Sequence, residues 1–272
     1  HFKRFKSLLV YLKQDIMKQL NVLKSLVIDS LDTITKGTKK YHIWMGFLTL
    51  VMLIGMYCYS IQLEKGLSVT GMSDRVSWGL YISNFTFLVG VAAAAVMLVM
   101  PTYVLKDIDF KQAVLIGEGL AVSALIMCLA FVVADMGGPS VLWHMIPGIG
   151  VFNFPNSMLT WDVIVLNGYL FINISIPFYI LFQHYQNKEA KKKVYVPGAV
   201  LSVFWAVGIH LVTAFLYQGL QARPFWNNAL LGPRFLASAF AAGPALIILV
   251  LAIIRSFTTF NIPDKTIKKI AL

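Results

Sequence analysis

The sequence predicts an all-α integral membrane protein, a multi-helix transmembrane bundle. Of its 272 residues, 58% are hydrophobic and only 13% are charged, against about 25% charged residues in a typical soluble domain. Six apolar stretches each approach or exceed the roughly 20 residues that a helix needs to cross a hydrocarbon core. They are residues 43–63, 78–105, 113–134, 163–182, 196–217 and 235–254.

The first 41 residues have a different pattern, because basic side chains are interspersed among the apolar ones. Phe2, Phe5 and Leu8, for example, stand among Lys3 and Lys6. The pattern suits an amphipathic helix lying on an anionic membrane surface, and it suits a solvated or partner-bound helix nearly as well. No small-residue cleavage site of the signal-peptide type follows. We therefore assign residues 1–41 to a basic amphipathic cytoplasmic segment and residues 42–272 to the transmembrane domain.

The positions of the lysines and arginines predict the orientation of the bundle. If the N-terminal segment is cytoplasmic, all but four of the 23 lysines and arginines lie on that side, and the exceptions are Lys65, Arg75, Arg223 and Arg234. Cytoplasmic loops carry an excess of these residues, so both ends of this chain are predicted to be cytoplasmic, in the inner cell membrane. The net charge of +11 is then explained without nucleic acid. The loop 135–162, which lacks Lys and Arg, is predicted to be exoplasmic.

Polar side chains near the exoplasmic ends of the helices predict a quinone site. Such a site needs an apolar slot, hydrogen-bonding groups for two ring oxygens, and groups that exchange protons. An imidazole near a carboxylate suits that task. The alternative is that the acids cap helices, the amides bond between helices and the histidine is an ordinary buried one. The residues that share this level are Asp135, Asp162, His210, Asn84, His144 and Asn167.

Glu118 is a separate case, because it lies nearer the cytoplasmic end of the third stretch. Its carboxyl group could open a proton path toward the middle of the membrane past Ser123 and Asn173. It could equally be neutral and hydrogen-bonded, without a role in transport.

The histidines and cysteines do not form the ligand sets of common redox metals. Cys58 and Cys128 are the only cysteines, whereas an iron-sulfur cluster is usually held by four thiolates. His42, His184 and His210 lie at different predicted depths, so they do not provide the matched pair of imidazoles that haem b requires. No Walker loop, zinc-ligand spacing or Ser-His-Asp order is evident. We expect no haem, iron-sulfur cluster or metal in this chain, and no catalysis by the chain alone.

Two of the six stretches have similar sequences. Residues 87–94 (FLVGVAAA) resemble residues 235–242 (FLASAFAA), and each segment follows an arginine, Arg75 or Arg234. Because both helices would run in the same direction, the similarity suggests a parallel repeat of four helices whose second copy begins near residue 234. Helices made of small residues also resemble one another by chance. The charged segment 265–269 is expected to be a loop between helices of a longer protein.

Five short stretches, taken together, resemble the NrfD/PsrC family of quinone-interacting membrane subunits. They are SWGLYISNFTFLVG (77–90), ADMGGP (134–139), SMLTWD (157–162), ARPFWN (222–227) and GPRFLAS (232–238). Within the family the chain is most similar to the DsrP type, from the DsrMKJOP complexes of sulfur-metabolising microbes. Many relatives have Arg at the position of Gly138, so the headgroup contacts of that stretch are not carried over.

The resemblance implies a redox role that the residues alone do not establish. It implies bound menaquinone or ubiquinone without haem, a link to sulfur or sulfite metabolism, and two four-helix bundles, with ten helices in DsrP-like chains. The implied partners are an exoplasmic iron-sulfur subunit, cytochrome b-type and cytochrome c-type subunits, and membrane lipids. By resemblance, Asp135, Asp162 and His210 handle quinone and protons, whereas Arg223 and Arg234 organise the exoplasmic interface or position an acid. An ion- or proton-translocating subunit and a purely anchoring subunit stay open as alternatives.

Overall fold

The computed structural model describes residues 2–76, 78–260 and 262–271, without the side chains of residues 2–12, Asp15, Ala94 and Gln112. Ser77, which begins the first of the five stretches, lies outside the described residues, and so do the side chains at the start of the amphipathic segment. The chain divides into two compact units. One comprises His1–Cys58 with Phe178–Lys191, and the other comprises Tyr59–Pro177 with Lys192–Leu272.

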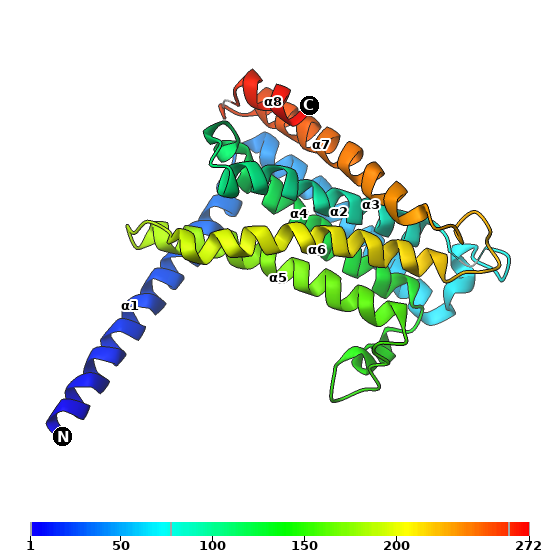
Figure 1. Ribbon diagram of the computed structural model, residues 1–272, viewed down its shortest axis with the longest axis horizontal. Helices are drawn as coiled ribbons and strands as arrows, with labels where there is room; N and C mark the ends of the chain where they lie inside the picture. Colours follow the sequence, from blue (N-terminus) through cyan, green and yellow to red (C-terminus); the bar gives the residue numbers. More distant parts are fainter. Residues whose placement is uncertain (1, 77, 261, 272) are drawn as a thin grey trace. The chain divides into compact units, whose positions relative to one another are not determined.

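The six predicted membrane spans are confirmed as six helices that are long and apolar enough to cross a bilayer (Figure 1). Five of them extend beyond the predicted apolar stretch at both ends, because a helix continues into the polar boundary of the bilayer. Asp162 was expected to open its helix but lies one turn inside it. The helices are α2 (Lys39–Lys65), α3 (Leu80–Val99, continued by a π-helical turn over Met100–Val104), α4 (Lys111–Asp135), α5 (Met158–Tyr185), α6 (Lys192–Gln218) and α7 (Leu231–Phe257).

The smaller unit contains helix α1 (Phe2–Thr35), most of α2 and the last turns of α5. Helix α1 covers most of the segment that the sequence predicted to be amphipathic. Near the C-terminal end of α1, the Asp29 carboxylate accepts a hydrogen bond from the hydroxyl group of Tyr185 at 3.1 Å. This bond joins α1 to the end of α5 within the unit.

Helix α3 is the centre of the larger unit, because it packs against α4, α6 and α7. Its small residues Ala92, Ala93 and Ala95 are buried. Small side chains let helix backbones approach closely, which favours helix association in lipid, where burying apolar surface between helices gains little. Helices α3 and α7 are in contact beside Gly90, where an added Cβ would lie 3.7 Å from the Cα of Ala239 in α7.

The predicted repeat relates residues that contact each other in the larger unit. Arg75 and Arg223 are 148 residues apart, the same offset as Phe87 and Phe235, so Arg223 matches Arg75 better than Arg234 does. The guanidinium group of Arg223 donates a hydrogen bond to the carbonyl group of Arg75 at 2.6 Å. Trp78 and Trp226, at the same offset, stack with their ring centroids 5.8 Å apart. These pairings favour the repeat, which stays a prediction.

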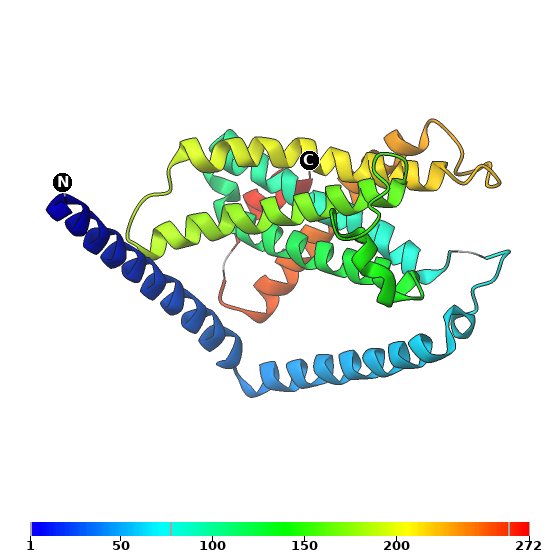
Figure 2. The same cartoon turned by 90° about the horizontal axis from the view of Figure 1, so that it is seen from below.

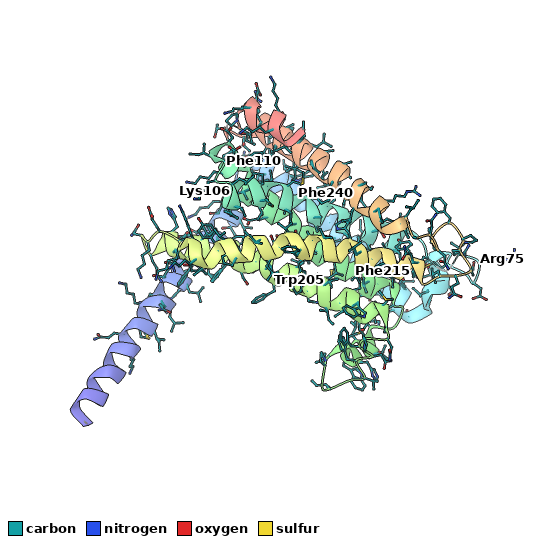
Figure 3. All side chains as sticks on the ribbon, viewed as in Figure 1. Arg75, Lys106, Phe110, Trp205, Phe215 and Phe240 are labelled. Atoms are coloured by element: carbon teal, nitrogen blue, oxygen red, sulfur yellow. The ribbon has the colours of Figure 1, made fainter. Side chains whose placement is uncertain are left out.

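Loops gather at two opposite ends of the larger unit, as both ribbon views show (Figures 1 and 2). The loops 66–76, 136–157 and 219–230 lie at one end, here called the Arg75 end. The loops 105–110 and 258–260 lie at the other end. Figure 3 labels Arg75 at the first end and Lys106 and Phe110 at the second. The loops that the sequence assigned to one side of the membrane therefore share one end of the unit.

The segment 265–269 was expected to be a loop but lies entirely within a short amphipathic helix, α8 (Asp264–Ala271). It docks on the 3-10 turn Ile108–Phe110, where Lys265 pairs with Asp109 at 2.9 Å and Lys269 pairs with Asp109 at 2.6 Å. Lys269 also pairs with Asp107, and the Thr266 hydroxyl donates to the Asp109 carbonyl at 2.8 Å. The sequence could not show this docking, because Asp107 and Asp109 lie more than 150 residues before the lysines that pair with them. Only the pair between Arg255 and Asp264, among the ion pairs of the described residues of α8, joins positions that are close in the sequence.

We predict that α8 stays docked at neutral pH and is released in strong acid. The hydrogen bonds from Lys269 hold the pKa of Asp107 and Asp109 below its usual range. A carboxyl group whose pKa is lowered on folding contributes stability above its unfolded value of about 3.9, and that contribution is lost as the pH falls through the folded value. The two carboxylates also raise the pKa of Lys269, so the same bonds are lost in strong base, above about 10.4.

Hydrogen exchange of residues 264–271, corrected for the intrinsic effect of pH, would measure the docking of α8. Asp109→Asn should speed this exchange at neutral pH, whereas Lys268→Gln, at an exposed position outside these ion pairs, should leave it unchanged. Equal exchange in the two variants would show that the ion pairs do not hold the helix.

Candidate functional site

A cavity of about 260 Å³ lies between α3, α6 and α7. Its walls are largely apolar, but they also carry the hydroxyl groups of two serines, one threonine and one tyrosine, and one imidazole. The small side chains of Ser238 and Ala242 leave part of this space open, beside the contact between Gly90 and Ala239. The lining residues are Ser83, Thr86, Phe87, Val89 and Gly90 from α3, His210 and Tyr217 from α6, and Phe235, Ser238, Ala239 and Ala242 from α7.

His210 supplies the imidazole group of the cavity, which can accept a hydrogen bond and a proton. The side chain is 2% exposed, and its Nδ1 lies 2.8 Å from the carbonyl oxygen of Ala206, one turn earlier in α6. Because a carbonyl oxygen only accepts, Nδ1 must carry the hydrogen. Nε2 has no hydrogen-bond partner within the described part of the chain. In the neutral tautomer this nitrogen is an acceptor, so it could take a hydrogen bond, and then a proton, from a hydroxyl group in the cavity.

Tyr217 connects the cavity to an aromatic cluster. Its hydroxyl group lies 2.5 Å from the Thr86 hydroxyl group, which also donates to the Ile82 carbonyl at 2.9 Å. The ring of Tyr217 packs edge-on against Trp78 and Trp226, with centroids 5.1 Å away in both cases. These contacts fix the ring, so the phenol group is held at the cavity wall.

The two acids of the predicted site do not line the cavity. Asp162 is 1% exposed and accepts a long hydrogen bond of 3.4 Å from Thr213, whose single hydroxyl hydrogen is closer to the Ile209 carbonyl, at 2.8 Å. One carboxylate oxygen of Asp135 is buried without a hydrogen-bond partner among the described residues. Both acids therefore keep hydrogen-bonding capacity that the described residues leave unused.

Three residues of the predicted site are not brought to the cavity. Asn84 is half-buried in α3 but does not line the cavity. His144 is exposed in the loop 136–157 and stacks on Trp143, with centroids 3.8 Å apart. Asn167 is exposed and donates to the Val163 carbonyl of its own helix at 2.8 Å. Asn167 turns outward because it lies about 100° around the helix from the buried Leu166.

The two predicted interface arginines lie at the Arg75 end. Arg223 donates to the Arg75 carbonyl and so joins two loops, and the Arg234 guanidinium group lies 5.0 Å from the ring centroid of Phe225. Neither arginine forms an ion pair with an acid in the part of the chain that the structure describes. Their contacts therefore favour the organising role over the acid-positioning role.

Glu118 lies in the larger unit away from the cavity. Its side chain is 3% exposed and accepts a hydrogen bond from the Tyr103 hydroxyl group at 3.1 Å. Asn173, the second residue of the predicted path, is also buried and donates to the Tyr169 carbonyl at 2.9 Å. Ser123 does not join them, because it is exposed and bonds to the Gly119 carbonyl of its own helix.

Sequence reasoning missed Gln62, which lies beside the end of α4. This amide is 2% exposed. It donates to the Ala134 carbonyl at 2.7 Å and accepts from the Tyr81 hydroxyl group at 2.6 Å. Gln62 thereby ties the last turns of α2, which belong to the larger unit, to α3 and α4 next to Asp135. An amide inside an apolar stretch was the available signal, since such a group needs partners in lipid.

The comparisons with known proteins identify relatives of this chain. The model of a family described as "Polysulphide reductase, NrfD" matches residues 68–272. A protein of Archaeoglobus fulgidus named "Hdr-like menaquinol oxidoreductase integral membrane subunit" is 27% identical over 233 residues, which cover 86% of this chain and 56% of that protein.

Two further relatives are subunits of reductases that differ in their substrates. A selenate reductase subunit of Mesobacillus selenatarsenatis is 24% identical, over 77% of this chain and 55% of that protein. The menaquinone reductase integral membrane subunit of Nitratidesulfovibrio vulgaris is also 24% identical, over 80% of this chain and 55% of that protein. The chain thus spans about half the length of the curated relatives that it matches.

We predict that Gln62→Leu lowers the free energy of unfolding in detergent by about 1–3 kcal/mol, the usual effect of leaving buried hydrogen-bonding groups unsatisfied. Thermal unfolding would measure the loss. Glu64→Gln, at an exposed position of the same helix, is the matched control and should cost little. A loss of the same size in both variants would mean that the two bonds of Gln62 do not anchor α2.

Proposed function

Since this chain belongs to the polysulphide reductase NrfD family, we propose that it is the quinone-binding membrane subunit of a respiratory electron-transfer complex. A menaquinone or menaquinol headgroup would bind in the cavity between α3, α6 and α7. The chain supplies the binding site and the proton-handling groups, and an iron-sulfur partner subunit exchanges the electrons. Relatives in two organisms are named as menaquinol oxidoreductase or menaquinone reductase subunits, which supports this choice of ligand.

The observation that carries the proposal is the unpartnered Nε2 of His210 beside a cavity inside a membrane bundle. Burying a polar atom without a partner is costly. A hydrogen bond from a ligand to this atom therefore contributes more binding free energy than the same bond would in water. The aromatic and aliphatic walls suit a quinone ring. The hydroxyl groups of Ser83, Thr86 and Ser238 suit its oxygens.

In the direction of quinol oxidation, two electrons leave for the partner cluster and two protons leave the ring hydroxyl groups. One hydroxyl group would donate its proton to Nε2 of His210, because the neutral imidazole accepts there. The other would pass its proton through the hydroxyl groups of Thr86 and Tyr217 toward Asp135 and Asp162. Reduction of a quinone would run through the same groups in reverse.

The Arg75 end is proposed to be exoplasmic, on the basis of the charge distribution. Four lysines and arginines belong to this side, and the remainder of the 23 belong to the other, as the positive-inside rule requires. The iron-sulfur subunit would dock on the loops 136–157 and 219–230, which lie at this end (Figures 1 and 2). Cytochrome b-type and c-type partners and the link to sulfur metabolism rest on the DsrP resemblance alone, because the relatives' names give different substrates.

Proton translocation is a second candidate function, favoured by the buried carboxyl group of Glu118. A buried carboxyl group in a membrane bundle is costly and often functional. Together with Tyr103 and Asn173 it would give protons an entry at the end opposite to the cavity. If no protons move along this path, the Glu118 carboxyl group only forms a hydrogen bond within the bundle.

We predict that His210→Ala and Asp135→Asn each slow the quinol-linked reduction of the partner clusters at least about 100-fold, the usual contribution of a general acid or base. Rapid-mixing absorbance of the clusters in the purified complex would measure the rate. Asn167→Ala, which changes an outward-facing amide in the same bundle, should leave the rate unchanged. Unchanged rates in the first two variants, with the complex assembled, would contradict the assignments.

A cavity-filling substitution tests the location of the headgroup independently. Ser238→Leu should raise the KM for quinol strongly, because the added side chain occupies the space that the ring needs. Phe240→Leu, at an exposed position of the same helix, should not. If Ser238→Leu left the KM unaltered, the headgroup would have to bind elsewhere.

A further inference from the structure

Helix α1 has no role in the quinone site, and it lies before residue 68, where the family match begins. Its described side chains present a stripe of large apolar residues that are 37–57% exposed. These residues recur at steps of four, three, four, four and three, so the pattern repeats about every eleven residues. Eleven residues make close to three full turns of an α-helix. The stripe therefore runs nearly parallel to the helix axis. The stripe consists of Ile16, Leu20, Leu23, Val27, Leu31 and Ile34.

Basic residues border this stripe. Lys13 and Lys24 are exposed and are eleven residues apart, so they follow the same period along one edge of it. A lysine at such an edge can rest its alkyl stem on apolar surface while its ammonium group reaches lipid phosphates. The opposite side of the helix is more polar. Asn21, Ser25 and Lys18 line a shallow groove there, together with Met17 and Val22. An apolar stripe, a basic edge and a polar back are the three faces of a helix at a membrane interface.

The end of α1 is fixed where the first span begins. The Tyr41 hydroxyl group, in the first turn of α2, donates to the Ile34 carbonyl at 2.7 Å. The Tyr41 ring covers Gly37, where an added Cβ would lie 2.1 Å from a ring carbon, so the joint requires glycine. Within the smaller unit, Figure 2 shows α1 leaving the joint at an open angle to α2 rather than folding back along it. The stripe therefore starts at the boundary of the bilayer.

We propose that α1 binds the anionic lipid surface of the membrane that α2 enters, with the apolar stripe among the acyl chains and Lys13 and Lys24 at the headgroups. At 1.5 Å per residue the helix covers about 50 Å of that surface. Charge complementarity favours lipid over an apolar protein groove, because the lysines lie at the edge of the stripe. This inference does not depend on the quinone site.

Spin labels on the full chain in nanodiscs test the proposal. A label at Leu23→Cys reports the stripe. A label at Ser25→Cys, about 200° further around the helix, reports the polar back and is the matched control. Cys58→Ser and Cys128→Ala remove the native thiols. In phosphatidylcholine with phosphatidylglycerol, the label at position 23 should collide several-fold more with oxygen than with a water-soluble nickel chelate, and the label at position 25 should show the reverse.

Two results would overturn the proposal. A label at position 23 that collides freely with the nickel chelate would mean a solvated helix, and one shielded from both reagents would mean that a protein covers the stripe. A separate experiment tests whether anionic lipid and the two lysines contribute to binding. Omitting phosphatidylglycerol, or introducing Lys13→Glu together with Lys24→Glu, should lower the ratio of oxygen to nickel collisions at position 23. An unchanged ratio would contradict the role of the lysines.

Discussion

A polar group inside a bilayer cannot be hydrated, and this constraint decides where the polar side chains of this chain lie. Gln62 bonds to α3 and α4, and Glu118 accepts from Tyr103. His210 and Asp135 keep atoms that are buried and unpartnered among the described residues. The cost of those atoms makes them the best candidates for a bound ligand, and His210 also lines a cavity. The candidate site is thus identified by buried polar atoms that have no hydrogen-bond partner among the described residues.

The position of the cavity follows from the small residues of α3 and α7. Close approach at Gly90 brings the two helices together, and the small side chains of Ser238 and Ala242 leave room beside it. Stacking of Trp78 on Trp226 joins the loops that precede these two helices, at the Arg75 end. If α7 begins a second copy of the four-helix unit, the cavity lies where one copy meets the next, and both copies supply its wall.

The sequence predicted the six spans well, because spans depend on local composition. It also selected His210, which lines the cavity, since ionisable residues in or next to apolar stretches are few, and it selected Asp162 for the same reason. Their roles in the site stay predictions. It did not separate Asn167 from these two, because depth along a helix does not tell which way a side chain faces. It missed Tyr217 and Gln62, whose importance comes from contacts with Thr86 and Ala134 in other helices. Helix α8 was expected to be a loop, since most of the ion pairs that hold it are made with the distant Asp107 and Asp109.

The most direct test of the central claim is a density map of the complex purified with its native lipids and quinones retained. We expect a quinone headgroup between α3, α6 and α7, with a ring oxygen within hydrogen-bonding distance of Nε2 of His210. A headgroup bound elsewhere in the bundle, with this cavity filled by an acyl chain, would contradict the account.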